Sequence, residues 1–193
     1  MAFCFMPTYI YHIKRIEPMM NSLAFRIAMA IKNANSEETH SVEVMQYSLG
    51  IILNTLLIIA GTSIIGFISG TYAECLTFLF CFSILRLASG GFHLKTATVC
   101  NIVTILLSTL LPSLITFPDS ALWIANIISL IIIVIFAPNP DNNARIPTSI
   151  FPLLKLVSIL MVSSNFFLQS SVIGLAFIVQ SLTVIPWTRR RIH

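Results

Sequence analysis

Reactive side chains are concentrated in one short stretch, RLASGGFHLKTATVC, which runs from Arg86 to Cys100 between two long apolar segments. Cys100 follows His93 and Lys95, and a neighbouring base or cation favours the thiolate, which is the nucleophilic form of cysteine. A nucleophilic cysteine paired with a histidine base performs acyl transfer. The residue types therefore indicate a membrane thiol enzyme, either a protease or an acyltransferase.

The other cysteines, Cys4, Cys75 and Cys81, have no histidine close in sequence and lie in apolar settings, where a thiol stays inert. The cysteines are scattered without a CxxC spacing, which argues against a zinc site and against a disulfide scaffold. We therefore expect no metal and no cofactor.

The spacing of His93 and Cys100 constrains the local structure. On one continuous helix they would share a face but lie about 10 Å apart along the axis. A nucleophile and its base must approach to roughly 3 Å. A fold-back of the chain, or a helix that begins only near Thr96 or Thr98, removes this conflict, and both threonines are suitable N-caps.

The residues before His93 suggest a turn. Gly90 and Gly91 permit backbone conformations or close approaches that side chains would block, and they end the preceding apolar segment. Arg86 could extend to the membrane surface, bind a substrate carboxylate or steady the loop. Lys95 has the same alternatives, with an anchor at the membrane surface favoured.

The elements that carry this stretch must suit a lipid environment. The chain is 56% hydrophobic and 9% charged, whereas a soluble domain carries about 25% charged residues. Apolar runs long enough to cross a bilayer lie at about 46–69, 72–89, 99–117, 121–137, 152–170 and 171–187. The last two are continuous, and we place the break in NFFLQSS, residues 165–171. We predict an all-α integral membrane protein with about six transmembrane helices in a single membrane domain, 1–193.

All eleven Lys and Arg residues fall on one side of this arrangement. The segments on that side are 1–45, about 86–98, 138–155 and 188–193. By the positive-inside rule, both termini and the Arg86–Cys100 stretch face the cytoplasm. A five-span chain would put the RRRIH tail outside, which the rule disfavours. The charge pattern explains the net charge of +4 better than nucleic-acid binding does.

The chain is predicted to have three parts. Residues 1–45 form a cytoplasmic or interfacial amphipathic segment, residues 46–187 form the transmembrane helices, and residues 188–193 form a basic cytoplasmic tail.

Residues 18–45 show apolar positions at helical spacing, typical of an amphipathic helix that lies in the membrane interface or packs on the chain itself. The residues of this stripe are Leu23, Ile27, Ala30 and Ile31. An amphipathic peptide is an alternative ligand for such a helix. Gly66 and Gly70 in GFISG are small residues four apart, a spacing that allows close helix packing and leaves a homodimer open.

The pattern Arg-x3-Gly-Gly-x-His-x6-Cys resembles the accessory gene regulator protein B (AgrB) family of bacterial membrane cysteine peptidases, which act in peptide quorum sensing. It is carried by Arg86, Gly90, Gly91, His93 and Cys100. The loop FAPNPDNNARIP is similar to a loop of that family through Ala137, Pro138 and Pro147. The family loop is often rich in lysine, whereas here Arg145 is its one basic residue.

The resemblance implies that a short AgrD-like precursor peptide is cleaved at the cytoplasmic face of a bacterial cell membrane and cyclised to a thiolactone or lactone. It implies Cys100 as nucleophile and His93 as general base and then acid. The residues that would support the motif or position the substrate are Arg86, Gly90, Gly91, Lys95 and Arg145. The residue that orients His93 is open among Ser89, Asn101, Asp141, Asn142 and Asn143.

Two other functions fit part of the pattern. A lipid-directed acyltransferase would use the same cysteine, and the apolar content suits a small transporter, export protein or scaffold without enzymatic activity. A transport path usually carries intramembrane charges, and the polar residues of the spans are sparse. Those residues include Asn54, Asn101, Asn126 and Asn165.

Overall fold

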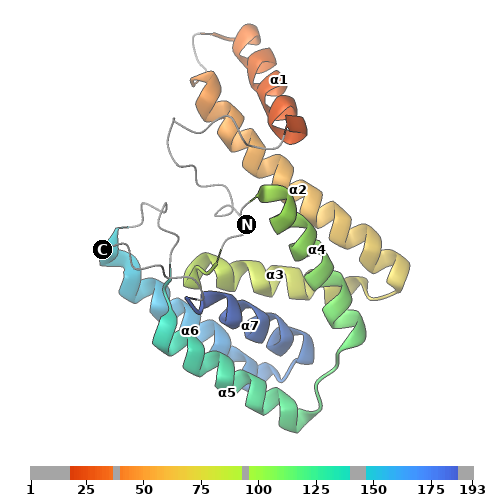
Figure 1. Ribbon diagram of the computed structural model, residues 1–193, viewed down its shortest axis with the longest axis vertical. Coiled ribbons are helices and arrows are strands. Elements are labelled where there is room, and N and C mark those ends of the chain that lie inside the picture. The colour runs from red at the N-terminus through yellow and green to blue at the C-terminus, as the bar shows by residue number, and fades with distance from the viewer. Residues whose placement is uncertain (1–17, 37–39, 93–95, 140–146, 187–193) are drawn as a thin grey trace.

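The computed structural model describes residues 18–36, 40–92, 96–139 and 147–186, which form a bundle of helices (Figure 1). The helices are α1 (Pro18–Ala34), α2 (Val42–Ser69), α3 (Tyr72–Ser89), α4 (Ala97–Leu114), α5 (Asp119–Phe136), η3 (Thr148–Ile150), α6 (Phe151–Leu168) and α7 (Ser171–Val184). Within the described ranges, extended pairing is limited to an isolated parallel bridge between Gly90 and Asn139. The predicted all-helical fold class is confirmed.

Five of the described helices, α2 to α6, are long and apolar enough to cross a bilayer. α7 has 14 residues, which at 1.5 Å per residue gives a length of about 21 Å, against a hydrocarbon core of about 30 Å. The sixth apolar run therefore folds as a separate but shorter helix. The number of crossings and the side on which each terminus lies stay predictions.

The break between the last two apolar runs lies where the polar cluster predicted it. α6 ends at Leu168, and Gln169 takes a left-handed conformation with φ of 50°. The Ser170 hydroxyl then caps α7 by accepting a hydrogen bond from the Ile173 N–H at 3.4 Å. The Asn165 side chain closes the turn by accepting from the Ser170 N–H at 3.1 Å. These polar groups satisfy the backbone at the helix ends.

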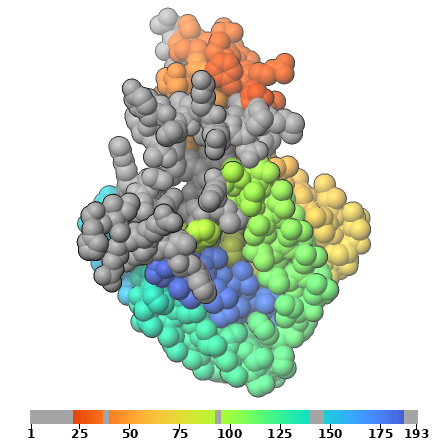
Figure 2. Space-filling model, viewed as in Figure 1, coloured from red at the N-terminus to blue at the C-terminus, as the bar shows by residue number. Residues whose placement is uncertain are grey.

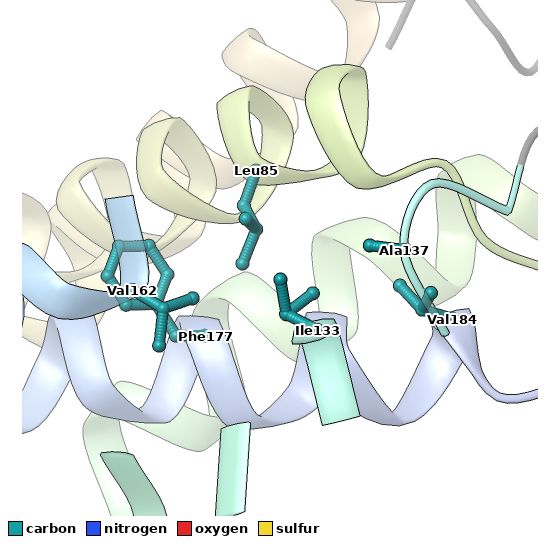
Figure 3. Packing of buried hydrophobic residues seen from close by; sticks show 6 residues of the cluster. All are labelled: Leu85, Ile133, Ala137, Val162, Phe177 and Val184. Carbon is teal, nitrogen blue, oxygen red and sulfur yellow. The ribbon is translucent and has the colours of Figure 1, made fainter. Parts of the chain in front are cut away.

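α7 packs against α3 and α5, and Figure 2 shows it between α4 and α5. Buried apolar side chains from α3, α5, α6 and α7 meet around it, together with one from the residue after α5 (Figure 3). They are Leu85, Ile133, Ala137, Val162, Phe177 and Val184. The most exposed apolar side chains lie on the longer helices, such as Phe67 of α2 and Phe167 of α6. This distribution suits helices whose outer surfaces face lipid.

The four asparagines singled out above are joined in two buried pairs. The Asn101 amide of α4 donates to the Asn54 carbonyl oxygen of α2. The Asn165 amide of α6 donates to the Asn126 carbonyl oxygen of α5 at 3.1 Å. Side-chain hydrogen bonds of this kind hold membrane helices together. The asparagines therefore connect neighbouring helices, which is a different arrangement from polar residues that line a transport path.

Hydroxyl pairs extend the polar contact along α4. The Thr62 and Ser108 hydroxyls of α2 and α4 lie 3.0 Å apart in a buried hydrogen bond. The Thr71 and Ser113 hydroxyls form a second, exposed pair at 3.0 Å, near the far ends of these helices. Together with the asparagine pair, these bonds fix the position of α4 along α2.

The N-terminal helix forms as predicted, but a different face of it packs on the chain. α1 lies against the start of α2, and both project beyond the other helices (Figure 1). The buried side chains are Ala24 and Ala28, whereas Leu23 and Ile31 of the predicted stripe are exposed. The reason is steric, because small side chains four residues apart let two helices approach closely. Of the two alternatives, the described contacts show packing on the chain itself.

The two glycines of GFISG shape the end of α2 and its contact with α3. A Cβ on Gly66 would lie 3.2 Å from both the Cys75 Cβ and the Tyr72 Cα. Gly70 ends α2 in the left-handed conformation, with φ of 73°. Close packing at Gly66 therefore joins α2 to the start of α3, whereas Gly70 serves to end the helix.

Candidate active site

Cys100 lies in the first turn of α4. The helix begins at Ala97, and the Thr96 hydroxyl caps it by accepting from the Val99 N–H at 3.3 Å. The helix therefore begins after His93, and a His93–Cys100 pair requires such a late start because one continuous helix would hold the two residues too far apart. The predicted cap at Thr96 is confirmed. His93, Lys95 and Arg145 lie outside the described residues.

The glycine turn that follows α3 has a backbone only glycine adopts easily. Gly90 has φ of 71° and Gly91 has φ of 134°. A Cβ on Gly91 would lie 2.7 Å from the Thr183 Oγ1 and 3.1 Å from the Thr183 carbonyl oxygen of α7. Both expected reasons for glycine, conformation and close approach, are confirmed at this position.

Backbone hydrogen bonds fasten this turn to two distant segments. The Gly91 N–H donates to the Asn139 carbonyl at 3.0 Å, and the Asn139 N–H donates to the Ser89 carbonyl at 2.9 Å. The Phe92 N–H donates to the Thr183 carbonyl at 2.7 Å. The Asn139 side-chain amide donates to the Val184 carbonyl at 2.9 Å. The carbonyls at the end of α7 are thus satisfied by the turn and by the segment after α5.

The side chain of Gln180 in α7 holds the glycine turn through hydrogen bonds, and the sequence analysis did not identify this residue. Its side chain is fully buried. Its amide nitrogen donates to the Gly90 carbonyl at 2.7 Å and to the Ser89 hydroxyl at 3.1 Å. Its amide oxygen accepts from Arg86 at 3.3 Å and from the Thr183 hydroxyl at 3.1 Å. The available signal was a lone glutamine in the apolar run GLAFIVQSLTV, because a buried polar group in a membrane helix needs partners.

Arg86 bridges the same elements. One guanidinium nitrogen donates to Gln180 and to the Thr183 hydroxyl, both at 3.3 Å. The other donates to the Phe92 carbonyl at 2.6 Å, and the guanidinium carbon lies 5.9 Å from the centre of the Phe82 ring. Of the roles considered for Arg86, these contacts match the one that steadies the loop, directly before His93.

Arg86→Lys is expected to destabilise the folded protein by about 1.5–3 kcal/mol, the usual contribution of one hydrogen bond to a charged group. A lysine ammonium cannot reproduce the fork that reaches Gln180 with one arm and Phe92 with the other. Thermal unfolding in detergent should show a lower midpoint. Arg26→Lys, on the exposed surface of α1, serves as control. Equal midpoints for the two variants would show that the fork is dispensable.

The structure describes two of the five candidates for the residue that orients His93, Ser89 and Asn101. Ser89 is buried, and its hydroxyl donates to the Leu85 carbonyl at 2.7 Å while accepting from Gln180. Asn101 is buried against Asn54 and keeps a free side-chain oxygen. Asp141, Asn142 and Asn143 lie outside the described residues.

The cysteines of the described residues differ in state. Cys75 is buried and Cys81 is partly buried, and both are free thiols. Cys100 is half-buried and disulfide-bonded. The spacing of the cysteines argued against a disulfide scaffold, and it did not predict this bond of Cys100. Cys75 of α3 is enclosed by contacts with Gly66 of α2 and Thr109 of α4.

A small cavity of about 20 Å³ lies beside Cys100. Its wall is formed by α2, α3 and α4 and includes Asn54, Phe82, Arg86 and Asn101. The cavity adjoins the buried network, because Arg86 belongs to both. The candidate site thus combines a cysteine at a helix start, a cavity lined by both apolar and polar residues, and a glycine turn held by hydrogen bonds.

Comparison with known proteins supports the resemblance. The chain matches the family described as Accessory gene regulator B over residues 24–186. A protein of Halalkalibacterium halodurans described as AgrB-like is 31% identical over 106 residues, which cover 55% of this chain and 53% of the relative. An AgrB-like protein of Clostridium perfringens strain SM101 is 32% identical over 90 residues, 47% of this chain and 42% of the relative.

The chain spans about half the length of the curated relatives it matches. No solved structure matches it significantly. The family match includes the whole motif from Arg86 to Cys100 and the network residues of α7. The chain belongs to the accessory gene regulator B (AgrB) family.

Proposed function

We propose that the chain is a membrane cysteine peptidase that processes a short AgrD-like precursor peptide. Family membership supports a part in agr quorum-sensing peptide processing. The observation that carries the proposal is the position of Cys100, in the first turn of α4 at a cavity that Arg86 also lines, and Arg86 holds the Phe92 carbonyl. Phe92 directly precedes His93 in the sequence, so the network holds the backbone up to the residue before the proposed base.

Cleavage begins when the Cys100 thiolate attacks a peptide carbonyl near the carboxyl end of the precursor. A C–S bond forms and the C–N bond breaks, and His93, which held the thiol proton, passes it to the leaving amine nitrogen. The carboxyl-terminal fragment departs, and the rest of the peptide stays on Cys100 as a thioester.

Ring closure releases the enzyme. An internal cysteine thiol or serine hydroxyl of the peptide attacks the thioester carbonyl and gives its proton to His93. The bond to Cys100 breaks, a thiolactone or lactone forms, and Cys100 returns as a thiolate. Water competes with this step, and a site at the membrane boundary excludes part of it. Lys95 and Arg145 serve as positive charges that position the precursor.

The environment of Cys100 supports a nucleophilic role in the reduced protein. The amino terminus of a helix carries a positive partial charge, which favours a thiolate in its first turn. The thiol must be free, so the active form is the one in which the disulfide of Cys100 is reduced. The distribution of Lys and Arg supports a site at the cytoplasmic face, where cellular reductants keep thiols reduced.

The test is a cleavage assay in cells. The chain is co-expressed with the short peptide encoded beside its gene, tagged at both ends, and loss of the carboxyl-terminal tag is followed. Cys100→Ala and His93→Ala should retain the tag, whereas wild type and the matched control Cys81→Ala should release it. Cleavage by Cys100→Ala would refute the proposed function.

A further inference from the structure

A residue that lines the cavity beside Cys100 carries a buried hydrogen-bond acceptor without a partner among the described residues. Among the described residues, two buried side-chain oxygens lack a hydrogen-bond partner, Asn101 Oδ1 and Ser181 Oγ. Asn101 is 5% exposed, follows Cys100 directly in α4 and lines the same cavity. A buried acceptor left unsatisfied is unfavourable, so this oxygen is a binding point for a hydrogen-bond donor.

The direction of this oxygen is fixed by the asparagine pair. The other end of the Asn101 amide donates to Asn54 of α2, which is also 5% exposed. Because an amide group is planar, a bond at its nitrogen fixes where its oxygen points. Asn54 therefore holds the Asn101 oxygen in place, and a ligand meets an acceptor that is already oriented.

The size of the cavity limits what this acceptor can bind. A volume of about 20 Å³ accommodates one water-sized group, which is also the size of an amide N–H. The wall contains the Phe82 ring and the Arg86 guanidinium, and a cation in the wall disfavours a positively charged donor such as an ammonium. The chemistry that fits is a single neutral N–H, the donor of a peptide bond.

We propose that this cavity is the subsite for the N–H of the peptide bond that Cys100 cleaves, with Asn101 Oδ1 as its acceptor. The inference rests on the proposed function and adds a specificity to it. In a peptide bond the nitrogen is one bond from the carbonyl carbon, so a carbon within reach of Sγ brings its N–H to the adjoining cavity. Substrates whose scissile bond lacks an N–H, such as esters of lipids or a bond before proline, leave Asn101 unsatisfied and are rejected.

A pair of small alkylating reagents tests the cavity without any precursor. Chloroacetamide and chloroacetone have nearly the same shape, and the first carries an NH2 group where the second carries a methyl group. Both alkylate a reduced thiol, and each rate for Cys100 is divided by the rate for glutathione. In the wild-type protein we expect the ratio of chloroacetamide to chloroacetone to exceed unity by about tenfold, the usual effect of one buried hydrogen bond.

Variants of the two α2–α4 pairs separate binding from helix packing. Asn101→Leu and Asn54→Leu should bring the ratio to unity. Thr62→Val and Ser108→Ala break the neighbouring buried bond between the same helices and should keep the wild-type ratio. Mass spectrometry of the Cys100 peptide gives the rates, and the thermal midpoints show whether each variant is folded.

Three results would overturn the inference. The first is a wild-type ratio of unity, and the second is an unchanged ratio in Asn101→Leu. The third is a loss of the ratio in Ser108→Ala as large as that in Asn101→Leu, which would make the asparagine pair a helix contact only. If Asn101 instead orients His93, Asn101→Leu alters the pH dependence of both alkylation rates and leaves their ratio unchanged. Because this assay uses no precursor, its result stands apart from that of the cleavage assay, which tests the proposed function.

Discussion

Gly91→Ala is expected to abolish precursor cleavage while the chain still enters the membrane. The new methyl group would meet the Thr183 Oγ1 at 2.7 Å, on a backbone with φ of 134°. Such a backbone costs a non-glycine residue about 1–3 kcal/mol, and overpacking adds about 1–3 kcal/mol. The turn must move away from α7, and a displacement of about 1 Å can reduce catalysis about 100-fold. Release of the carboxyl-terminal tag measures the effect.

Gly70→Ala is the matched control for this prediction. Gly70 also has a positive φ, 73°, but nothing lies within 4 Å of the position of a Cβ. Only the backbone cost of about 1–2 kcal/mol applies, and the residue lies at the opposite end of α3 from the glycine turn. We expect Gly70→Ala to cleave at nearly the wild-type rate. Wild-type cleavage by Gly91→Ala would mean that contact between the turn and α7 is unnecessary.

Gln180→Leu is expected to cause a loss of cleavage of similar size together with a loss of stability. The substitution removes the donor to the Gly90 carbonyl and the acceptor for Arg86. Buried groups left unsatisfied cost about 1–3 kcal/mol each, so the total should be roughly 3 kcal/mol. Cleavage in membranes and the unfolding midpoint in detergent measure the two effects separately.

Ser181→Ala provides the control on the next residue of the same helix. Ser181 is fully buried, and its hydroxyl has no hydrogen-bond partner among the described residues. Removing an unsatisfied buried hydroxyl should be neutral or slightly stabilising. Gln180→Glu adds a second comparison, because it keeps an oxygen towards Arg86 and loses the donor to Gly90. If Gln180→Leu and Ser181→Ala behave alike, the network has no role in holding the turn.

Hydropathy and local capping rules predicted most of the helices. The apolar run at 72–89 corresponds to α3, and the polar cluster at 165–171 contains the turn between α6 and α7. Thr96 could be identified as a cap because capping depends on residues three positions apart. These features follow from the sequence because they are determined within a few residues along the chain.

The network around the turn could not be predicted because its partners are far apart in the sequence. Gln180 bonds to Gly90, 90 residues earlier, and Asn54 bonds to Asn101, 47 residues later. In the sequence Asn54 and Asn101 are isolated polar residues, and only the packing of α2 on α4 shows that they form a pair. The packed face of α1 was missed for a related reason, because the periodic apolar stripe outweighed the small residue Ala24, which suits close contact.

The fastening of the turn by α7 also sets an order in time. The ribosome makes Gly90 of the motif 90 residues before Gln180. A nascent chain that ends before α7 therefore already contains Cys100, the proposed nucleophile, while the Gly90 carbonyl still lacks its donor. Packing of α7 against α3 then completes the hydrogen bonds of the glycine turn. We expect the nascent chain to lack the proposed cleavage activity until α7 has been made and has packed against α3.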